Sequence, residues 1–301
     1  MAYAAIFEHV SVQVRYYTDP ACSWSWGAEP VLRKLFWEFE GELEFVWAMG
    51  GLARRYGRSY RDDDGRIGSG ADCFADLMAH WLDVGAETGM PGDPRLWTEN
   101  PLSSTYPSCI AVEAASEQGW EAGYRYLRRV REGLFCERRR LDDTEALTAE
   151  AEAAGLDRER FEAALESSSA LETFGAHMAE ARDVPEQARA EKKVRRTEGK
   201  ERVSFPSALF IAEDGARHGV WGWQPLEAYR EAALAAGATQ VNAAPLAPLD
   251  ALARFGRLAT RELEVLAETD APTTRAELWR LASEDHLRPV PLLTGTMWEA
   301  A

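Results

Sequence analysis

The sequence of 301 residues predicts an α/β fold that is interrupted by a large helical insertion. Three observations lead to this prediction: a strand–helix–strand pattern within residues 10–52, a long stretch of helical apolar spacing over 71–195, and a second strand-rich stretch within 200–237. Because parallel strands need a crossover helix between them, the first stretch indicates the start of a βαβ sheet. We therefore expect residues 10–52 and 200–237 to form one domain around the sheet, with residues 71–195 as a helical insertion domain.

The first unit is defined by two alternating runs. Residues 10–17 and 42–48 alternate apolar and polar side chains, which predicts strands, and residues 22–40 carry apolar side chains at helical spacing, which predicts one helix between them. Residues 53–70 are rich in Arg, Asp and Gly without periodicity, so we expect a loop.

The later elements follow from the same patterns. Strand character returns at 203–213, Glu213-Asp214-Gly215 predicts a hairpin turn, and residues 217–221 and 225–236 predict the returning strand and a last helix. Beyond Gly237 comes a linker rich in Ala and Pro. Helical patterns at 249–258, 259–268 and 274–284 then predict a small helical appendage over residues 249–301.

Composition excludes several classes of function. The net charge is −16, which disfavours nucleic acid and anionic membranes as partners. No apolar run reaches the ~18 residues of a membrane helix, and Met1–His9 lacks the basic start of a signal peptide, so we expect a cytoplasmic protein. The histidines and cysteines show no metal-ligand spacing, and no cofactor motif is present, so we expect neither metal nor cofactor.

Cys22 is the candidate reactive group. It follows the Asp19-Pro20 turn and opens the predicted helix, where backbone N–H groups and the helix dipole favour a thiolate. Ser25 lies three positions on, and its hydroxyl can donate a hydrogen bond to the sulfur but cannot resolve a mixed disulfide. Burial against Trp24 and Trp26 would raise the pKa of Cys22; we expect the stabilising terms to prevail if the sulfur is partly exposed. The alternative is a buried, inert cysteine.

Two further features have open interpretations. Seven basic residues lie between Arg189 and Arg202, either as an electropositive rim for an anionic thiol or as a solvated helix end and loop. Cys109, at the start of a predicted helix, is either a distant resolving thiol or a small buried apolar residue, and the second interpretation also applies to Cys73 and Cys136.

The element order and the segment Asp19-Pro20-Ala21-Cys22-Ser23-Trp24-Ser25-Trp26-Gly27-Ala28-Glu29-Pro30 resemble the DsbA family of thioredoxin-fold oxidoreductases, and especially its cytoplasmic branch with the protease adaptors of the SpxH type. The resemblance implies a thioredoxin-like fold over roughly residues 10–237. It also implies a cis bond between Phe205 and Pro206, facing Cys22 and ready to pair with an extended substrate. The chain departs from the family at Ser25, where a second cysteine is usual.

Together these features predict a monothiol thiol–disulfide oxidoreductase or a disulfide isomerase. Cys22 and Ser25 would be the catalytic pair, and Trp24, Phe205 and Pro206 would bind the substrate. The substrate would be a disulfide-containing protein or a small thiol, with glutathione as a candidate co-substrate. Two alternatives remain open: an enzyme similar to kappa-type glutathione transferases or chromene-carboxylate isomerases, and a non-catalytic adaptor that binds a partner protein.

Overall fold

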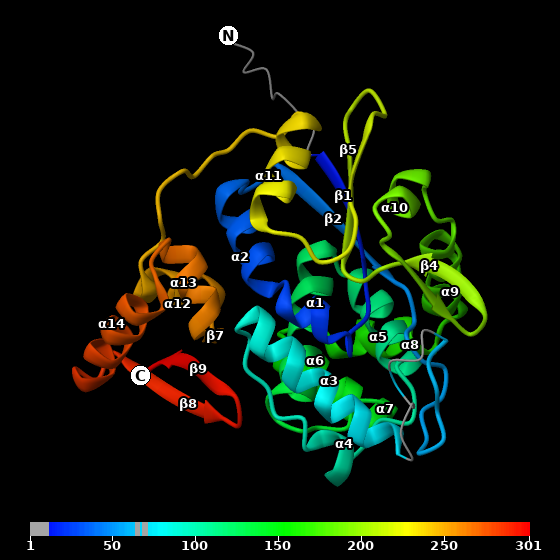
Figure 1. Cartoon of the computed structure of the whole chain (residues 1–301), viewed down its shortest axis with the longest axis horizontal. Coiled ribbons are helices and arrows are strands. Elements are labelled where there is room, and N and C mark those ends of the chain that lie inside the picture. Colours follow the sequence, from blue (N-terminus) through cyan, green and yellow to red (C-terminus); the bar gives the residue numbers. More distant parts are fainter. Residues whose placement is uncertain (1–11, 64–66, 68–71) are drawn as a thin grey trace.

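The computed structural model describes residues 12–63, 67 and 72–301 (Figure 1). The first two residues of the predicted strand 10–17, the segment Met1–His9 and part of the predicted loop 53–70 lie outside this range. The central sheet has the order β2-β1-β5-β6, with β1 parallel to β2 and the other neighbours antiparallel. Its strands are β1 (Val12–Thr18), β2 (Leu43–Met49), β5 (Ser207–Ile211) and β6 (Arg217–Val220). This mixed sheet is thioredoxin-like, which confirms the predicted fold class.

Side-chain alternation divides the sheet into two covered faces. On one face Tyr16 and Trp47 meet edge to face at 5.6 Å, and Phe36 of helix α2 (Glu29–Glu38) and Tyr124 of helix α6 (Trp120–Phe135) extend this aromatic cluster. On the other face the phenol of Tyr17 donates a hydrogen bond to Glu180 of helix α9 (Ser168–Arg182). Helices therefore pack against both sides of β1.

The insertion between β2 and β5 is mainly helical, and in the described part of the chain no helix is long and apolar enough to span a membrane. One buried cluster contains Val14 and Phe45 of the sheet together with Tyr126 and Val130 of α6, so the insertion packs directly on the sheet. Its helices besides α6 and α9 are α3 (Cys73–Thr88), α4 (Leu96–Glu99), α5 (Tyr106–Ser116), α7 (Thr144–Ala153), α8 (Arg158–Glu166) and α10 (Glu186–Ala190).

The predicted helix 22–40 is two helices in the structure. Helix α1 (Ser23–Gly27) has only five residues, and α2 begins at Glu29 after a break at Ala28. Pro30 explains the break, because a proline has no N–H to donate to the carbonyl of Trp26 and its ring clashes with the preceding turn. Proline is well tolerated at the start of the next helix, where no such bond is needed.

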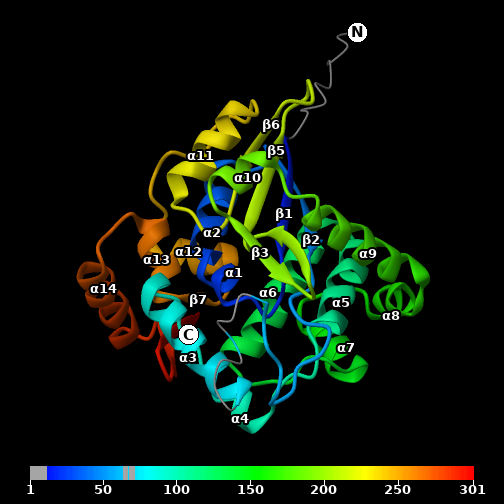
Figure 2. The same ribbon diagram turned by 45° about the vertical axis from the view of Figure 1, so that its right-hand side comes forward.

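The basic run that ends at Arg202 is neither a helix end nor a loop in its second half. It forms a two-stranded hairpin, β3 (Val194–Thr197) and β4 (Lys200–Val203), which lies next to α9 in Figure 1 and in front of the sheet in Figure 2. Glu198 and Gly199 at the turn both have positive φ angles, 53° and 76°, as the type I′ turn of a two-residue hairpin requires. The high charge of this segment hides its strand character in the sequence.

The C-terminal segment is partly helical, as predicted, but its end forms a sheet. After helix α11 (Leu226–Ala235) come α12 (Pro248–Phe255), α13 (Thr260–Ala267) and α14 (Ala271–Ser283), close to the predicted positions. The predicted helical appendage over 249–301 does not include strands β7 (Leu258–Ala259), β8 (Leu287–Leu292) and β9 (Gly295–Ala300), which form a sheet in the order β7-β9-β8. Strand β8 could not be predicted because it contains Pro289 and Pro291. It is an edge strand, where prolines are tolerated.

A buried ion cluster joins this C-terminal segment to the rest of the molecule. The guanidinium group of Arg128 on α6 binds Glu29 at 3.0 Å and Glu262 of α13 at 2.8 Å. Arg131 binds Glu29 as well, and it donates a hydrogen bond of 2.6 Å to the hydroxyl of Thr18 at the end of β1. Burial by itself would raise the pKa of Glu29, but the two guanidinium groups lower it to about 2. Glu29 is therefore ionised at neutral pH.

Replacing Glu262 by Gln should destabilise the protein by about 3 kcal/mol, because Arg128 would keep a buried positive charge with one fewer carboxylate. Urea unfolding at neutral pH measures this change. The matched control is Glu277→Gln on α14, whose partner Arg280 is exposed and whose loss should have a much smaller effect. Equal effects of the two substitutions would show that the cluster does not stabilise the fold.

Candidate functional site

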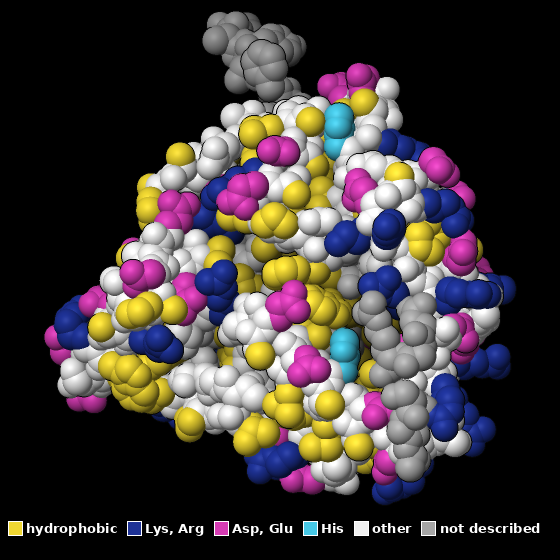
Figure 3. Space-filling view, in the orientation of Figure 1, with side chains coloured by type: hydrophobic (Ala, Val, Ile, Leu, Met, Phe, Trp, Pro, Cys, Tyr) yellow, Lys and Arg dark blue, Asp and Glu magenta, His cyan; other side chains and the backbone are white. Residues whose placement is uncertain are grey.

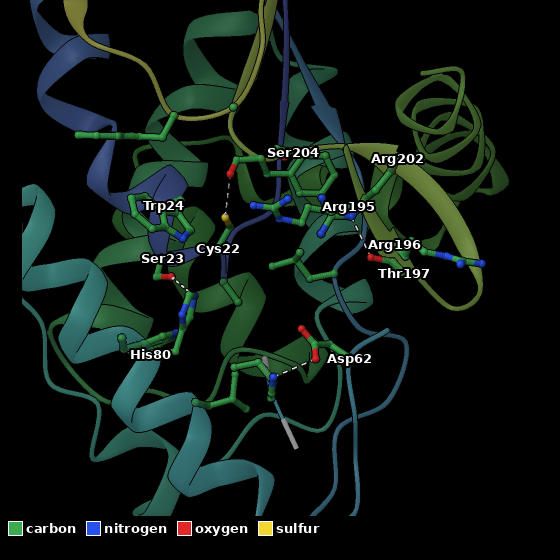
Figure 4. Close-up of a pocket in the computed structure, with 18 of the residues that line it drawn as sticks. Cys22, Ser23, Trp24, Asp62, His80, Arg195, Arg196, Thr197, Arg202 and Ser204 are labelled. Carbon is green, nitrogen blue, oxygen red and sulfur yellow. Dashed lines mark hydrogen bonds between the residues drawn. The ribbon is translucent and has the colours of Figure 1, made fainter. Parts of the chain in front are cut away.

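Cys22 lies at the start of α1, opposite the loop that precedes β5 (Figure 4). Its thiol donates a long hydrogen bond of 3.8 Å to the carbonyl oxygen of Phe205, and the peptide bond between Phe205 and Pro206 is cis. The structure thus brings together three of the predicted site residues from distant parts of the sequence. Cys22 is 6% exposed, and Phe205 is equally buried.

A buried carboxylate fixes the turn that presents Cys22. Asp19 accepts hydrogen bonds from the backbone N–H groups of Ala21 at 2.9 Å and Leu52 at 2.8 Å, and from the Thr105 hydroxyl at 2.8 Å. The thiol of Cys109 also donates to Asp19, at 3.3 Å, and burial raises the pKa of Cys109 well above its usual range. Cys109 is thereby a hydrogen-bonded core residue, which favours the apolar interpretation over that of a resolving thiol.

A thiolate at Cys22 is expected only for a partly exposed sulfur, and the structure does not meet this condition, because Cys22 is buried. Burial raises the pKa of Cys22, and interactions with Ser25 and with the guanidinium group of Arg202 only partly offset it. The physical reason is that α1 has five residues rather than nineteen, so its dipole is small, while the sulfur is nearly enclosed. The Ser25 hydroxyl is itself fully buried and makes no hydrogen bond of ordinary geometry among the described residues, although its proximity to the sulfur lowers the pKa of Cys22.

Cys22 nevertheless borders a cavity of about 330 Å³. In Figure 3 a hollow on this face of the molecule has a hydrophobic floor and is flanked by Lys and Arg side chains. The cavity lies between α1, α3 and the β3–β4 hairpin. The described residues that matter for its chemistry are the cations Lys193, Arg195, Arg196 and Arg202, the carboxylates Asp62 and Glu87, the aromatic residues Trp24, Phe205 and Trp223, and the polar residues Ser23, His80 and Ser204.

Arg202 connects the hairpin to the residue that faces Cys22. Its guanidinium carbon lies 4.1 Å from the centre of the Phe205 ring, which is a close cation–π contact. Arg202 also donates to the Thr197 hydroxyl at 2.8 Å and to the carbonyl of Val203 at 2.9 Å. These contacts orient the Phe205 side chain, while its carbonyl accepts from Cys22. Only the basic run in the sequence pointed towards Arg202.

Two other pairs complete the walls of the cavity. Trp24 packs at 5.7 Å against Trp223, which the sequence analysis did not select. The Ser23 hydroxyl lies 3.1 Å from Nε2 of His80 on α3, so the residue next to Cys22 is tied to the insertion. No local pattern could have found His80 or Trp223, because they meet α1 only in the folded chain. Among the described residues no cluster of His, Cys, Asp and Glu could hold a metal ion.

The family follows from a comparison with protein-family models. The model described as thioredoxin matches residues 16–185, more than half of the chain and including Cys22, so the chain belongs to the thioredoxin family. Its similarities are those of a DsbA-like protein of the SpxH type. It is 24% identical over 290 residues to the ClpXP adapter protein SpxH of Halalkalibacterium halodurans, covering 95% of this chain and 88% of that protein. The identity to the protein of the same name from Shouchella clausii is 26%, with 96% and 88% coverage.

Solved structures show the same fold. A putative protein disulfide isomerase from Nitrosomonas europaea superposes with a TM-score of 0.57 at 20% identity, covering 75% of this chain and 97% of that one. The cytosolic disulfide reductase DsbM from Pseudomonas aeruginosa gives 0.51 at 22% identity, with 74% and 98% coverage. At this level of identity the superpositions show a shared fold.

Gly50 is required beside Phe205. A Cβ atom at Gly50 would lie 1.9 Å from the Phe205 ring, whereas one at Gly57 would meet nothing within 4 Å. Gly50→Ala should therefore displace Phe205, cost about 1–3 kcal/mol of stability and expose Cys22, while Gly57→Ala should change little. Thermal unfolding and the alkylation rate of Cys22 measure the two effects. An unchanged alkylation rate in Gly50→Ala would show that Phe205 does not cover the sulfur.

The raised pKa of Cys22 predicts a specific pH dependence. Only the thiolate reacts with iodoacetamide, so the rate at Cys22 should be low at neutral pH and should rise with pH through a midpoint above the ~8.5 of a free cysteine. Peptide mass spectrometry after timed alkylation follows the site. A midpoint below that of free cysteine would mean that Ser25 and Arg202 outweigh burial in solution.

Proposed function

We propose that the protein is a monothiol thiol–disulfide oxidoreductase in which Cys22 forms mixed disulfides. One observation carries this proposal: the Cys22 sulfur lies 3.8 Å from the carbonyl of Phe205, in the cis-proline loop, at the wall of an open cavity. The Phe205 carbonyl can accept a backbone hydrogen bond from an extended substrate, and Trp24 lines the same cavity. The fold of the solved relatives is consistent with this activity.

The reaction has two exchange steps. The Cys22 thiolate attacks one sulfur of a disulfide, a new S–S bond forms at Cys22, and the other sulfur leaves as a thiolate. A second thiolate from solution then attacks the mixed disulfide at the substrate sulfur and releases Cys22 with its electron pair. The chain itself cannot carry out the second step at this site, because Ser25 stands where a resolving thiol would be. A reducing cytoplasm would supply the external thiol.

The raised pKa of Cys22 sets the conditions for this chemistry. In the resting state the buried sulfur holds its proton, so the free protein reacts slowly. A raised pKa also makes Cys22 a strong nucleophile once ionised and a poor leaving group in a mixed disulfide. Mixed disulfides at Cys22 should therefore be long-lived. We accordingly expect slow turnover, with Cys22 holding the substrate thiol for a long time.

Incubation with oxidised glutathione should add one glutathione to Cys22, visible by intact mass spectrometry without reductant. Cys22→Ser should abolish the adduct, and Cys73→Ser, which removes another free thiol, should keep it. Ser25→Cys should shorten the life of the adduct, since the new thiol can attack the mixed disulfide. If the wild-type protein forms no adduct at Cys22 even at alkaline pH, the oxidoreductase proposal fails.

A second candidate function is that of an adapter for a protease of the ClpXP type. The observation in its favour is that similarity to the SpxH adapters covers 95% and 96% of this chain, well past residue 185, where the family model ends. The C-terminal segment has its own buried core, with Leu263 and Trp298 among its members, and presents Trp279 at 55% exposure. Degradation of a bound partner by purified ClpXP, unchanged in Cys22→Ser, would favour this function over redox activity.

A further inference from the structure

The cavity beside Cys22 has an uneven distribution of charge. Among the described residues that line it, four cations come from the β3–β4 hairpin and its flank, whereas the carboxylates Asp62 and Glu87 come from other elements. Figure 4 shows Arg195 and Arg202 near the sulfur, with His80 and Asp62 on the other side of the cavity. The carboxylate of Asp62 already accepts the N–H of Ile67 at 2.9 Å. The hairpin side therefore presents net positive charge in a protein whose total charge is −16.

Neutral polar groups at the cavity also lack partners. Ser204 is 8% exposed, and neither its hydroxyl nor the Nε1–H of Trp223 makes a hydrogen bond within the described residues. Buried polar atoms in folded proteins nearly always have partners. Both residues line the cavity. A ligand with hydrogen-bond acceptors would supply the missing partners of both groups after a small adjustment of their side chains.

The size of the cavity favours a small molecule. A volume of about 330 Å³ is at the lower end of the range for small-ligand sites, about 300–1,000 Å³. Trp24 and Trp223 form an aromatic wall on the side of α1, and the hairpin forms the opposite, cationic wall. The negative charge of the whole protein would repel a large acidic partner, while cations close to the site act on a small anion over a few ångströms.

We propose that this cavity binds an anionic low-molecular-weight thiol, or its disulfide, with carboxylates on the hairpin cations and sulfur at Cys22. Lys193 and Arg195 are the specificity-determining residues, and Arg202 is a positioning residue that acts through Phe205. The covalent step at Cys22 rests on the proposed function. The preference of the cavity for negative charge does not, because binding can be measured without reaction.

Disulfide probes of different charge test this preference. At one pH and low salt, the rates at Cys22 are compared for dianionic dithiobis-nitrobenzoate, neutral dithiodipyridine and dicationic cystamine. Lys193→Gln and Arg195→Gln should each slow the dianionic probe by about fivefold, leave the neutral probe nearly unchanged and speed the cationic probe. Arg189→Gln is the matched control, because Arg189 is a neighbouring cation that pairs with Glu201 and does not line the cavity.

The outcomes separate the two proposals. If all three probes react and the cavity variants do not differ from Arg189→Gln, the charge preference is refuted while the redox function stands. If no probe reacts at Cys22, the redox function fails, and calorimetric titration with S-methylglutathione, which has no free thiol, then decides on the cavity. Binding that weakens about fivefold in Arg195→Gln supports the inference, and absence of binding to the wild-type protein overturns it.

Discussion

The ion cluster around Glu29 is the constraint on which the rest of the structure depends. Glu29 begins α2 directly after the segment that carries Cys22, and Arg131 connects it to Thr18 at the end of β1. Arg128 extends the cluster to Glu262 in the C-terminal segment. Every charge in it is buried, so each member would be costly without its partners. The cluster therefore fixes the first strand, the second helix, the insertion and the C-terminal segment relative to one another, and with them the turn at Cys22.

Within that frame, the reactivity of Cys22 is a balance between burial and charge. Asp19 holds the turn, and Arg202 packs on Phe205. Burial raises the pKa of the sulfur, while Arg202 and Ser25 lower it. The outcome is a protonated, covered thiol beside an open cationic cavity. Such a site differs from a dithiol oxidase, in which a second cysteine both activates and resolves. It is suited to holding one thiol at a time.

The two functions suggested by the relatives are physically compatible. The similarity to SpxH adapters extends over the C-terminal segment, whereas the Cys22 site lies in the part matched by the thioredoxin model. The two regions are connected by Trp26, which stands in the same short helix as Ser25 and lies 4.7 Å from Arg128, the partner of Glu262. A thiol bound at Cys22 and a partner bound at the C-terminal segment would therefore act on one continuous set of buried contacts.

Local sequence was sufficient for most of the elements and for the selection of Cys22 and Phe205, which face each other in the structure. Alternation defined β1 and β2, helical spacing defined the insertion, and Cys22, Ser25 and Pro206 could be selected before any coordinates. It was not sufficient for β8, because its two prolines are unusual in a strand, or for the β3–β4 hairpin, because its high charge is untypical of strands. Nor could it give the pKa of Cys22, because that depends on the cover provided by Phe205 and on Arg202, both far along the chain. Periodicity is a local property that a sequence carries by itself, whereas burial and electrostatic fields arise only when distant segments meet.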